Sequence, residues 1–160
     1  MRIGKTYFKV YDLILGALSL VVLIAVSIWL LVHWGSIPDL VPTHYDFSGN
    51  IDGTGGKSNI LIMLGLAWFI WLTFTVLDFF PGAWNVRGLS EISSTVGKAK
   101  AISLTRTFLQ IIKFLIAILF SYLTICQAQG RAASPLLLPL SIFLLMGASV
   151  VHILLLSRLK

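Results

Sequence analysis

A short polar stretch between two long apolar ones gathers several side chains that could do chemistry. Residues 42–58 contain His44, Asp46, Asp52 and Lys57 among several glycines. Pro38 and Pro42 favour extended backbone before them, and residues two apart in an extended strip share a face. This spacing predicts that His44 lies beside Asp46. The glycines allow turns that bring Asp52 and Lys57 back towards them.

These residue types leave several kinds of chemistry open. The imidazole of His44 and the carboxylates of Asp46 and Asp52 form a partial ligand set for a divalent metal ion such as zinc. An EF-hand is excluded, because the twelfth position counted from Asn50 is Leu61, where that loop needs a glutamate. Two further roles fit the same residues, namely recognition of a ligand or partner and a purely structural role.

We expect the stretch to form an ordered cap built around His44. In such a cap Asp46 or Asp52 orients one ring nitrogen of His44, and the other nitrogen is left for backbone, a ligand or an ion. Lys57 then neutralises whichever of the two carboxylates remains. Motifs of common hydrolases, such as HExxH and GxSxG, do not occur, and the single cysteine, Cys126, lies in an apolar stretch. The sequence therefore leans against an enzyme, and no cofactor is implied apart from the divalent metal.

The rest of the chain has the composition of a membrane protein. Of its 160 residues, 58% are hydrophobic and only 11% are charged, whereas a soluble domain carries about a quarter charged residues. Apolar stretches of about 20 residues cross a bilayer as helices. Four occur here, at residues 13–34, 60–80, 108–126 and 136–156. They predict an all-α, four-helix transmembrane bundle, one integral membrane domain over residues 1–160, with no substantial β-sheet.

The distribution of basic residues predicts the orientation of the bundle. Of the twelve Lys and Arg residues, all except Lys57 and Arg131 fall on the side of the N-terminus. By the positive-inside rule both termini face the cytoplasm, the extended, glycine-rich loop at residues 35–59 faces outward, and residues 81–107 form a cytoplasmic loop. The net charge of +6 then reflects topology and anionic lipid. The bilayer is thus a partner, and nucleic acid is not.

The cytoplasmic loop carries signals for helix ends. Pro81 and Gly82 stop the second span, and Ser90 followed by Glu91 predicts an N-cap from which a helix runs into the third span. Lys113, a turn or two inside that span, can extend its ammonium back to the interface. The tryptophans near the ends of the first two spans are typical of interfacial belts.

Ionisable residues inside apolar spans are functional candidates. Asp78 and His152 fall at similar depth near the inner ends of the second and fourth spans, and Asp12 begins the first. A contact between Asp78 and His152 is one interpretation. The simpler one, which we favour, is that all three reach the inner interface and are solvated there.

The outer loop also resembles a known family. Its sequence, IPDLVPTHYDFSGNIDGTGGKS, resembles a bacterial membrane domain of unknown function that occurs in SdpI-like proteins. The shared pattern falls on Pro38, Pro42, His44, Gly49, Asp52, Gly53 and Lys57. The segment FFPGAWN, residues 79–85, resembles the family's exit from the second helix. The resemblance covers about residues 13–126.

This resemblance implies a multi-pass protein of the bacterial cytoplasmic membrane. SdpI-like proteins protect a producing bacterium from a secreted peptide toxin and relay its arrival to a cytoplasmic repressor. The resemblance therefore implies that this chain gives immunity to, or senses, an extracytoplasmic peptide or envelope stress. The implied partners are an extracytoplasmic peptide and a membrane or cytoplasmic protein. The alternative is a metal-dependent membrane enzyme or ion-coupled small transporter that uses His44, Asp46 and Asp52.

The predicted orientation can be tested by labelling single cysteines in intact cells. A cysteine at Ser48 should react with an impermeant reagent from outside, and one at Ser94 should react only from inside. The reverse pattern would contradict the topology.

Overall fold

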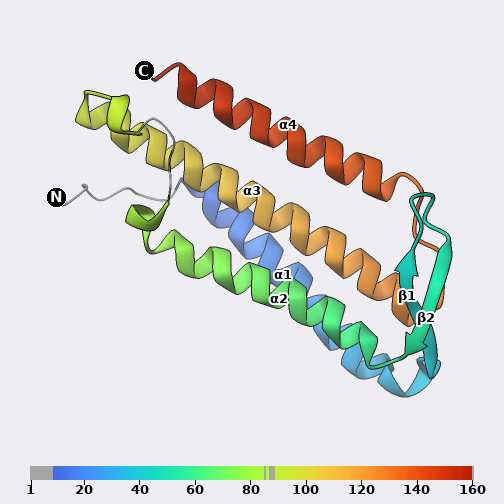
Figure 1. Cartoon of the computed structure of the whole chain (residues 1–160). Helices are drawn as coiled ribbons and strands as arrows, with labels where there is room; N and C mark the ends of the chain where they lie inside the picture. Colours follow the sequence, from blue (N-terminus) through green and yellow to red (C-terminus); the bar gives the residue numbers. More distant parts are fainter. Residues whose placement is uncertain (1–8, 85, 87–88, 160) are drawn as a thin grey trace.

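The computed structural model describes residues 9–84, 86 and 89–159 (Figure 1). Five residues used in the sequence analysis lie outside this description. Four belong to the charge distribution, Arg2, Lys5, Arg87 and Lys160, and one, Asn85, belongs to the family resemblance. The elements in chain order are α1 (Val10–His33), the 3-10 turn η1 (Trp34–Ser36), β1 (Leu40–Tyr45), β2 (Ile51–Gly56), α2 (Asn59–Asp78), the 3-10 turns η2 (Pro81–Ala83) and η3 (Leu89–Glu91), α3 (Thr95–Ala128) and α4 (Leu137–Ser157).

The four α-helices are each long and apolar enough to cross a membrane. They run alternately up and down. The start of α1 and the end of α4 therefore lie at one end of the bundle, and the two strands lie at the other (Figure 1). The helix α3 is central, because α1, α2 and α4 all pack against it. The expected set of four apolar helices, and with it the character of a multi-pass membrane protein, is confirmed.

The start of α3 differs from the expectation. As expected, one continuous helix runs from the predicted cytoplasmic loop into the third span, but it begins at Thr95. Ser94, and not Ser90, is its N-cap: its backbone is extended and its hydroxyl accepts a hydrogen bond from the N–H of Gly97 at 2.9 Å. Ser90 instead lies within the short turn η3, where its backbone cannot take the extended conformation of a cap.

The expectation of no substantial sheet is also corrected. Within the stretch 35–59, β1 and β2 form a two-stranded antiparallel sheet in which Pro42 faces Thr54 and His44 faces Gly53. The expectation rested on the cost of unpaired backbone in lipid. That cost does not apply here, because the hairpin lies beyond the ends of the helices (Figure 1) and its strands pair with each other.

A regular seam on α1 faces the rest of the bundle. Its buried residues recur at intervals of seven, four, three and four, a spacing typical of a helix packed on a partner: they are Asp12, Ser19, Leu23, Val26 and Leu30. The indole N–H of Trp71 donates to the Ser19 hydroxyl at 2.9 Å, and that of Trp68 donates to Ser27 at 3.0 Å. These two tryptophans therefore link α2 to α1, which an interfacial belt does not require.

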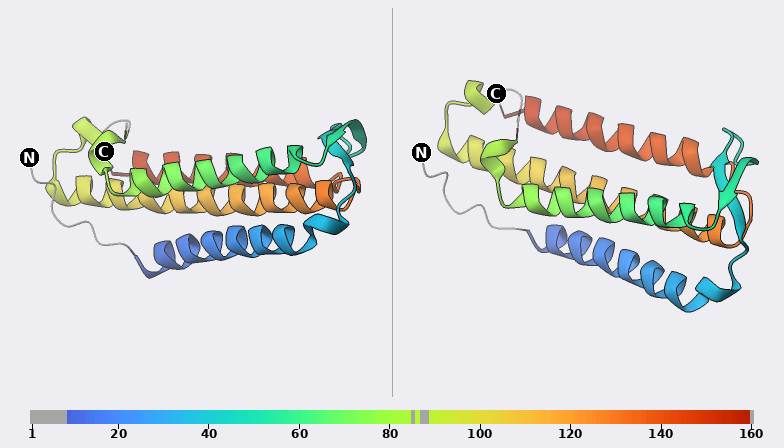
Figure 2. Two further views of the ribbon diagram at one scale, coloured as in Figure 1. Left: turned by 90° about the horizontal axis from the view of Figure 1, so that it is seen from below. Right: turned by 60° about the horizontal axis from the view of Figure 1, so that its bottom comes forward.

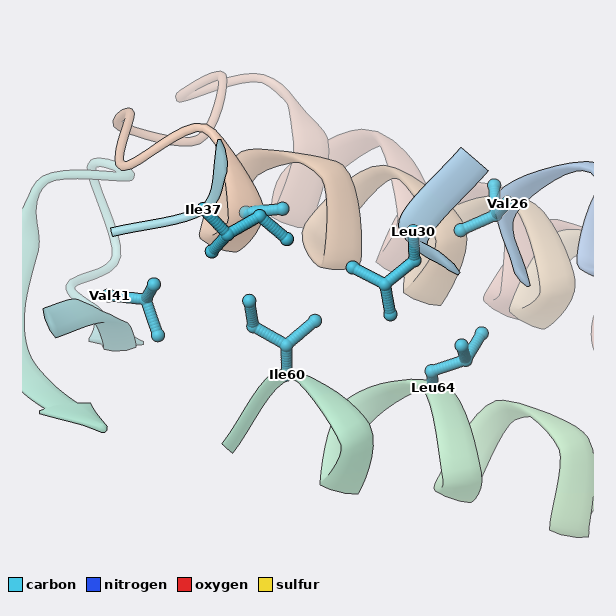
Figure 3. Close-up of a cluster of buried hydrophobic side chains, with 7 residues drawn as sticks. Val26, Leu30, Ile37, Val41, Ile60 and Leu64 are labelled. Carbon is cyan, nitrogen blue, oxygen red and sulfur yellow. The ribbon is translucent and has the colours of Figure 1, made fainter. Parts of the chain in front are cut away.

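An apolar cluster fastens the hairpin to the helix ends. It is formed by Val26, Leu30, Ile37, Val41, Ile60, Leu64 and Ala128 (Figure 3). The cluster joins α1, β1, α2 and α3, so the strand enters the same packed layer as the helices. Away from it, the backbones of α1 and α2 are set apart (Figure 2), and the side chains of Trp68 and Trp71 reach across to α1.

Candidate functional site

The hairpin presents a histidine–carboxylate pair on its surface. The Nδ1 atom of His44 lies 2.5 Å from Oδ1 of Asp52, and the two side chains are 73% and 45% exposed. Strand pairing places Gly53 opposite His44, and a Cβ at Gly53 would lie 3.1 Å from the His44 Cβ. Of the two carboxylates expected to orient His44, Asp52 does so. The bond fixes one ring nitrogen and leaves Nε2 for another partner.

Asp46 has a different role from the one expected. Its carboxylate accepts hydrogen bonds from the backbone N–H groups of Ser48 and Asn50, both at 2.8 Å, and from the Asn50 side chain at 3.0 Å. The Asn50 side chain and then its backbone are the main causes that lower the pKa of Asp46 below its ordinary value. This stabilisation of the turn is therefore present above the ordinary aspartate pKa, and it is lost as the pH falls through the lowered one.

Lys57 pairs with a residue outside the predicted set. Its Nζ atom lies 3.9 Å from Oδ1 of Asp39 and 5.3 Å from the ring centre of Trp34. Its backbone N–H donates a hydrogen bond to the Asp39 carbonyl at 2.9 Å. The expected pairing with Asp46 or Asp52 is thus wrong. Because the Asp39 side chain is 98% exposed, this ion pair adds little stability. The backbone bond is what closes the base of the hairpin.

The tip of the hairpin is docked on the connection between α3 and α4. Gly49 has φ +83, and its carbonyl accepts a hydrogen bond from the N–H of Ala133 at 2.9 Å. Two residues of β1 are also covered. Pro42 is buried, and Tyr45 is half-buried, which raises the pKa of its hydroxyl to about 12. A hollow of about 150 Å³ lies beside this contact, between the hairpin, α2, α3 and the start of α4, and His44 forms part of its wall.

The three residues suggested as metal ligands do not form one group. His44 and Asp52 are paired, whereas Asp46 is engaged by the turn. Among the residues that the structure describes, no group of three or more His, Cys, Asp or Glu side chains could hold a metal ion. What the hairpin offers is therefore an oriented, exposed imidazole.

A second polar group lies inside the bundle, around Asp78. Its Oδ2 atom accepts a hydrogen bond from Nε2 of Gln110 at 2.5 Å and lies 3.5 Å from Nζ of Lys113. The Lys113 ammonium also donates to Thr75 at 3.3 Å, and Arg106 donates to the backbone carbonyl of Asp78 at 3.3 Å. Asp78 and Lys113 are 5% and 3% exposed. Both are buried between α2 and α3.

This arrangement overturns several expectations about the spans. Asp78 is neither solvated nor in contact with His152, whose ring stacks on Phe108 with centroids 4.5 Å apart. The Lys113 ammonium is buried beside Asp78 instead of extending outward. Asp12, 1% exposed, receives hydrogen bonds from the N–H of Lys9 at 3.1 Å and from the Thr107 hydroxyl at 2.8 Å.

The sequence did contain a signal for this cluster. Arg106, Gln110 and Lys113 are spaced four and three residues apart, so they lie on one face of a helix. Three polar residues on one face of an apolar helix indicate a buried polar stripe that needs partners on a neighbouring helix. Asp78 is the acidic residue of the second span that supplies one.

Comparison with known proteins gives one match. Residues 20–74 match the family described as "Domain of unknown function (DUF1648)". The matched segment contains most of α1, the hairpin and most of α2. No curated protein and no solved structure matched the chain. The match and the four apolar helices fit a membrane domain whose activity has not been assigned.

Gly49 offers a test of hairpin docking. A Cβ at this position would lie 2.3 Å from the Ala133 carbonyl oxygen, and φ +83 is disfavoured for alanine by about 1–2 kcal/mol. Gly49→Ala should therefore release the tip and speed hydrogen exchange of the strand amides about tenfold. Gly35→Ala is the matched control, because a Cβ there meets nothing within 4 Å. Equal exchange in both variants would show that the docking contact does not hold the hairpin.

Proposed function

We propose that this chain is an SdpI-like protein of the bacterial cytoplasmic membrane that recognises an extracytoplasmic peptide. In this proposal both termini are cytoplasmic, the hairpin faces outward, and peptide recognition gives immunity or signals envelope stress. The observation that carries the proposal is the exposed His44–Asp52 pair on a hairpin that is fastened to the helices. The resemblance of the hairpin sequence to SdpI-like proteins supports the same function.

The geometry of the pair suits recognition. Asp52 holds one ring nitrogen of His44 at 2.5 Å, so the ring orientation is set before a ligand arrives. The hollow beside His44 provides a concave surface next to the free ring nitrogen. Phe47, 76% exposed at the turn, adds an aromatic side chain of the kind that contributes strongly to peptide binding.

The strands also suit a peptide ligand. β1 packs against α2 and α3, whereas the residues of β2 are exposed or half-exposed. An extended peptide can add to the free edge of such a strand through backbone hydrogen bonds.

The proposal is tested by survival of a sensitive bacterium that expresses the full chain. The cells are challenged with peptides secreted by the bacterium from which the gene comes. Expression should raise survival. His44→Ala and Asp52→Asn should lower the protected survival about tenfold or more, with membrane insertion and expression unchanged, because the oriented ring nitrogen is lost. His33→Ala is the matched control, since His33 lies near the same end but its ring bonds the Trp29 carbonyl of its own helix.

Two results would overturn the proposal. One is survival that is equal with and without the chain. The other is full protection by His44→Ala. One metal ion per chain in the purified protein, lost in His44→Ala, would instead favour the metal-dependent alternative.

A further inference from the structure

A cleft opens between α1 and α2 at the end of the bundle opposite the hairpin. Its volume is about 250 Å³. Leu13, Ala17 and Leu20 of α1 form an apolar wall, and Asp78, Gln110 and Lys113 lie on its polar side. Asp12 is the third residue of α1 and Asp78 is the last residue of α2. The polar side therefore lies close to the helix ends, at the level where lipid headgroups meet the hydrocarbon core.

Two acceptor atoms in this cleft lack donors. The Oδ1 atom of Asp78 and the Oε1 atom of Gln110 are buried without a hydrogen-bond partner in the structure, and the two residues are 5% and 3% exposed. A buried acceptor left unpaired costs about 1–3 kcal/mol. A ligand that donates more than one hydrogen bond would pair both of these neighbouring atoms.

The charges around the cleft narrow the choice of ligand. Both carboxylates that line the cleft already have partners: Asp78 lies beside Lys113, and Asp12 accepts hydrogen bonds from the Lys9 N–H and the Thr107 hydroxyl. The Lys113 ammonium is held near Oδ2 of Asp78, at 3.5 Å, and lies 5.3 Å from the ring centre of Trp71. A free metal cation or an anionic lipid would disturb this pairing in a region of low dielectric. A zwitterion with N–H donors and an apolar tail would not.

We propose that the cleft binds the headgroup of an aminophospholipid, whose primary ammonium donates to Oδ1 of Asp78 and Oε1 of Gln110. The ammonium carries three N–H donors, enough for both atoms. The acyl chains lie along the apolar wall of α1. This site is separate from the hairpin and does not depend on the function proposed for it.

The test uses the purified full-length chain in detergent and counts bound lipids by native mass spectrometry. Phosphatidylethanolamine, its N,N-dimethyl form and phosphatidylcholine share a charge but differ in N–H donors. We expect one tightly retained phosphatidylethanolamine per chain, weaker retention of the dimethyl form, and about tenfold weaker retention of phosphatidylcholine, the loss expected when hydrogen bonds to a charged donor disappear. Free ethanolamine tests whether the headgroup alone suffices. It should not compete at lipid concentrations, because it lacks the tail.

A glycine pair provides the matched variants. A Cβ at Gly16 would lie 3.2 Å from Oε1 of Gln110, whereas one at Gly65 meets nothing within 4 Å. Gly16→Ala should shield that oxygen and weaken phosphatidylethanolamine retention about tenfold, while Gly65→Ala should retain it. Asp78→Asn, if it folds, should do the same as Gly16→Ala.

Four results would overturn the assignment. Equal retention of phosphatidylcholine would mean that N–H donation is not recognised, and equal retention of phosphatidylglycerol would mean that the amine is not. Equal lipid retention by Gly16→Ala and Gly65→Ala would place any bound lipid elsewhere. Competition by free ethanolamine as strong as that of the lipid would reassign the site to a soluble amine.

Discussion

Charged groups between membrane helices are costly unless they meet a partner, and the position of α2 on α3 follows from this constraint. Asp78 ends α2, and the three polar residues of α3 that surround it, Arg106, Gln110 and Lys113, occupy one helix face. A shift of either helix by one turn would separate the buried carboxylate from the ammonium. Next to Arg106 on α3, the Thr107 hydroxyl donates to Asp12 and so fixes the start of α1.

The two ends of the bundle are held by different forces. At the Asp78 end the contacts are charged and polar, and α1 and α2 leave a cleft between them. At the hairpin end the contacts are apolar, and Val41 enters the same cluster as Leu30 and Ile60. A hairpin of two strands is marginal by itself, so the docking of Val41 and Gly49 onto the helices is what allows it to hold His44 in place.

The large features could be read from the sequence because each has a strong local signal. The four apolar stretches gave the helices, and Pro42 with the glycines indicated an extended strip with turns that brings a carboxylate to His44. The sheet was missed because strand pairing depends on partners distant in sequence, and glycine-rich β2 has low strand propensity. The partners of Lys57 and Lys113 were missed for a related reason: a single residue does not reveal which charged neighbour the fold will bring to it.

The central claim is that the buried pair of Asp78 and Lys113 holds α2 on α3. A double-mutant cycle tests it most directly, with Asp78→Asn, Lys113→Met and the double variant compared by thermal unfolding in one detergent. Each single variant leaves one buried charge without its partner and should lose about 3–5 kcal/mol of stability. The double variant, which buries neither charge, should be more stable than either single one. Losses that simply add in the double variant would contradict the account.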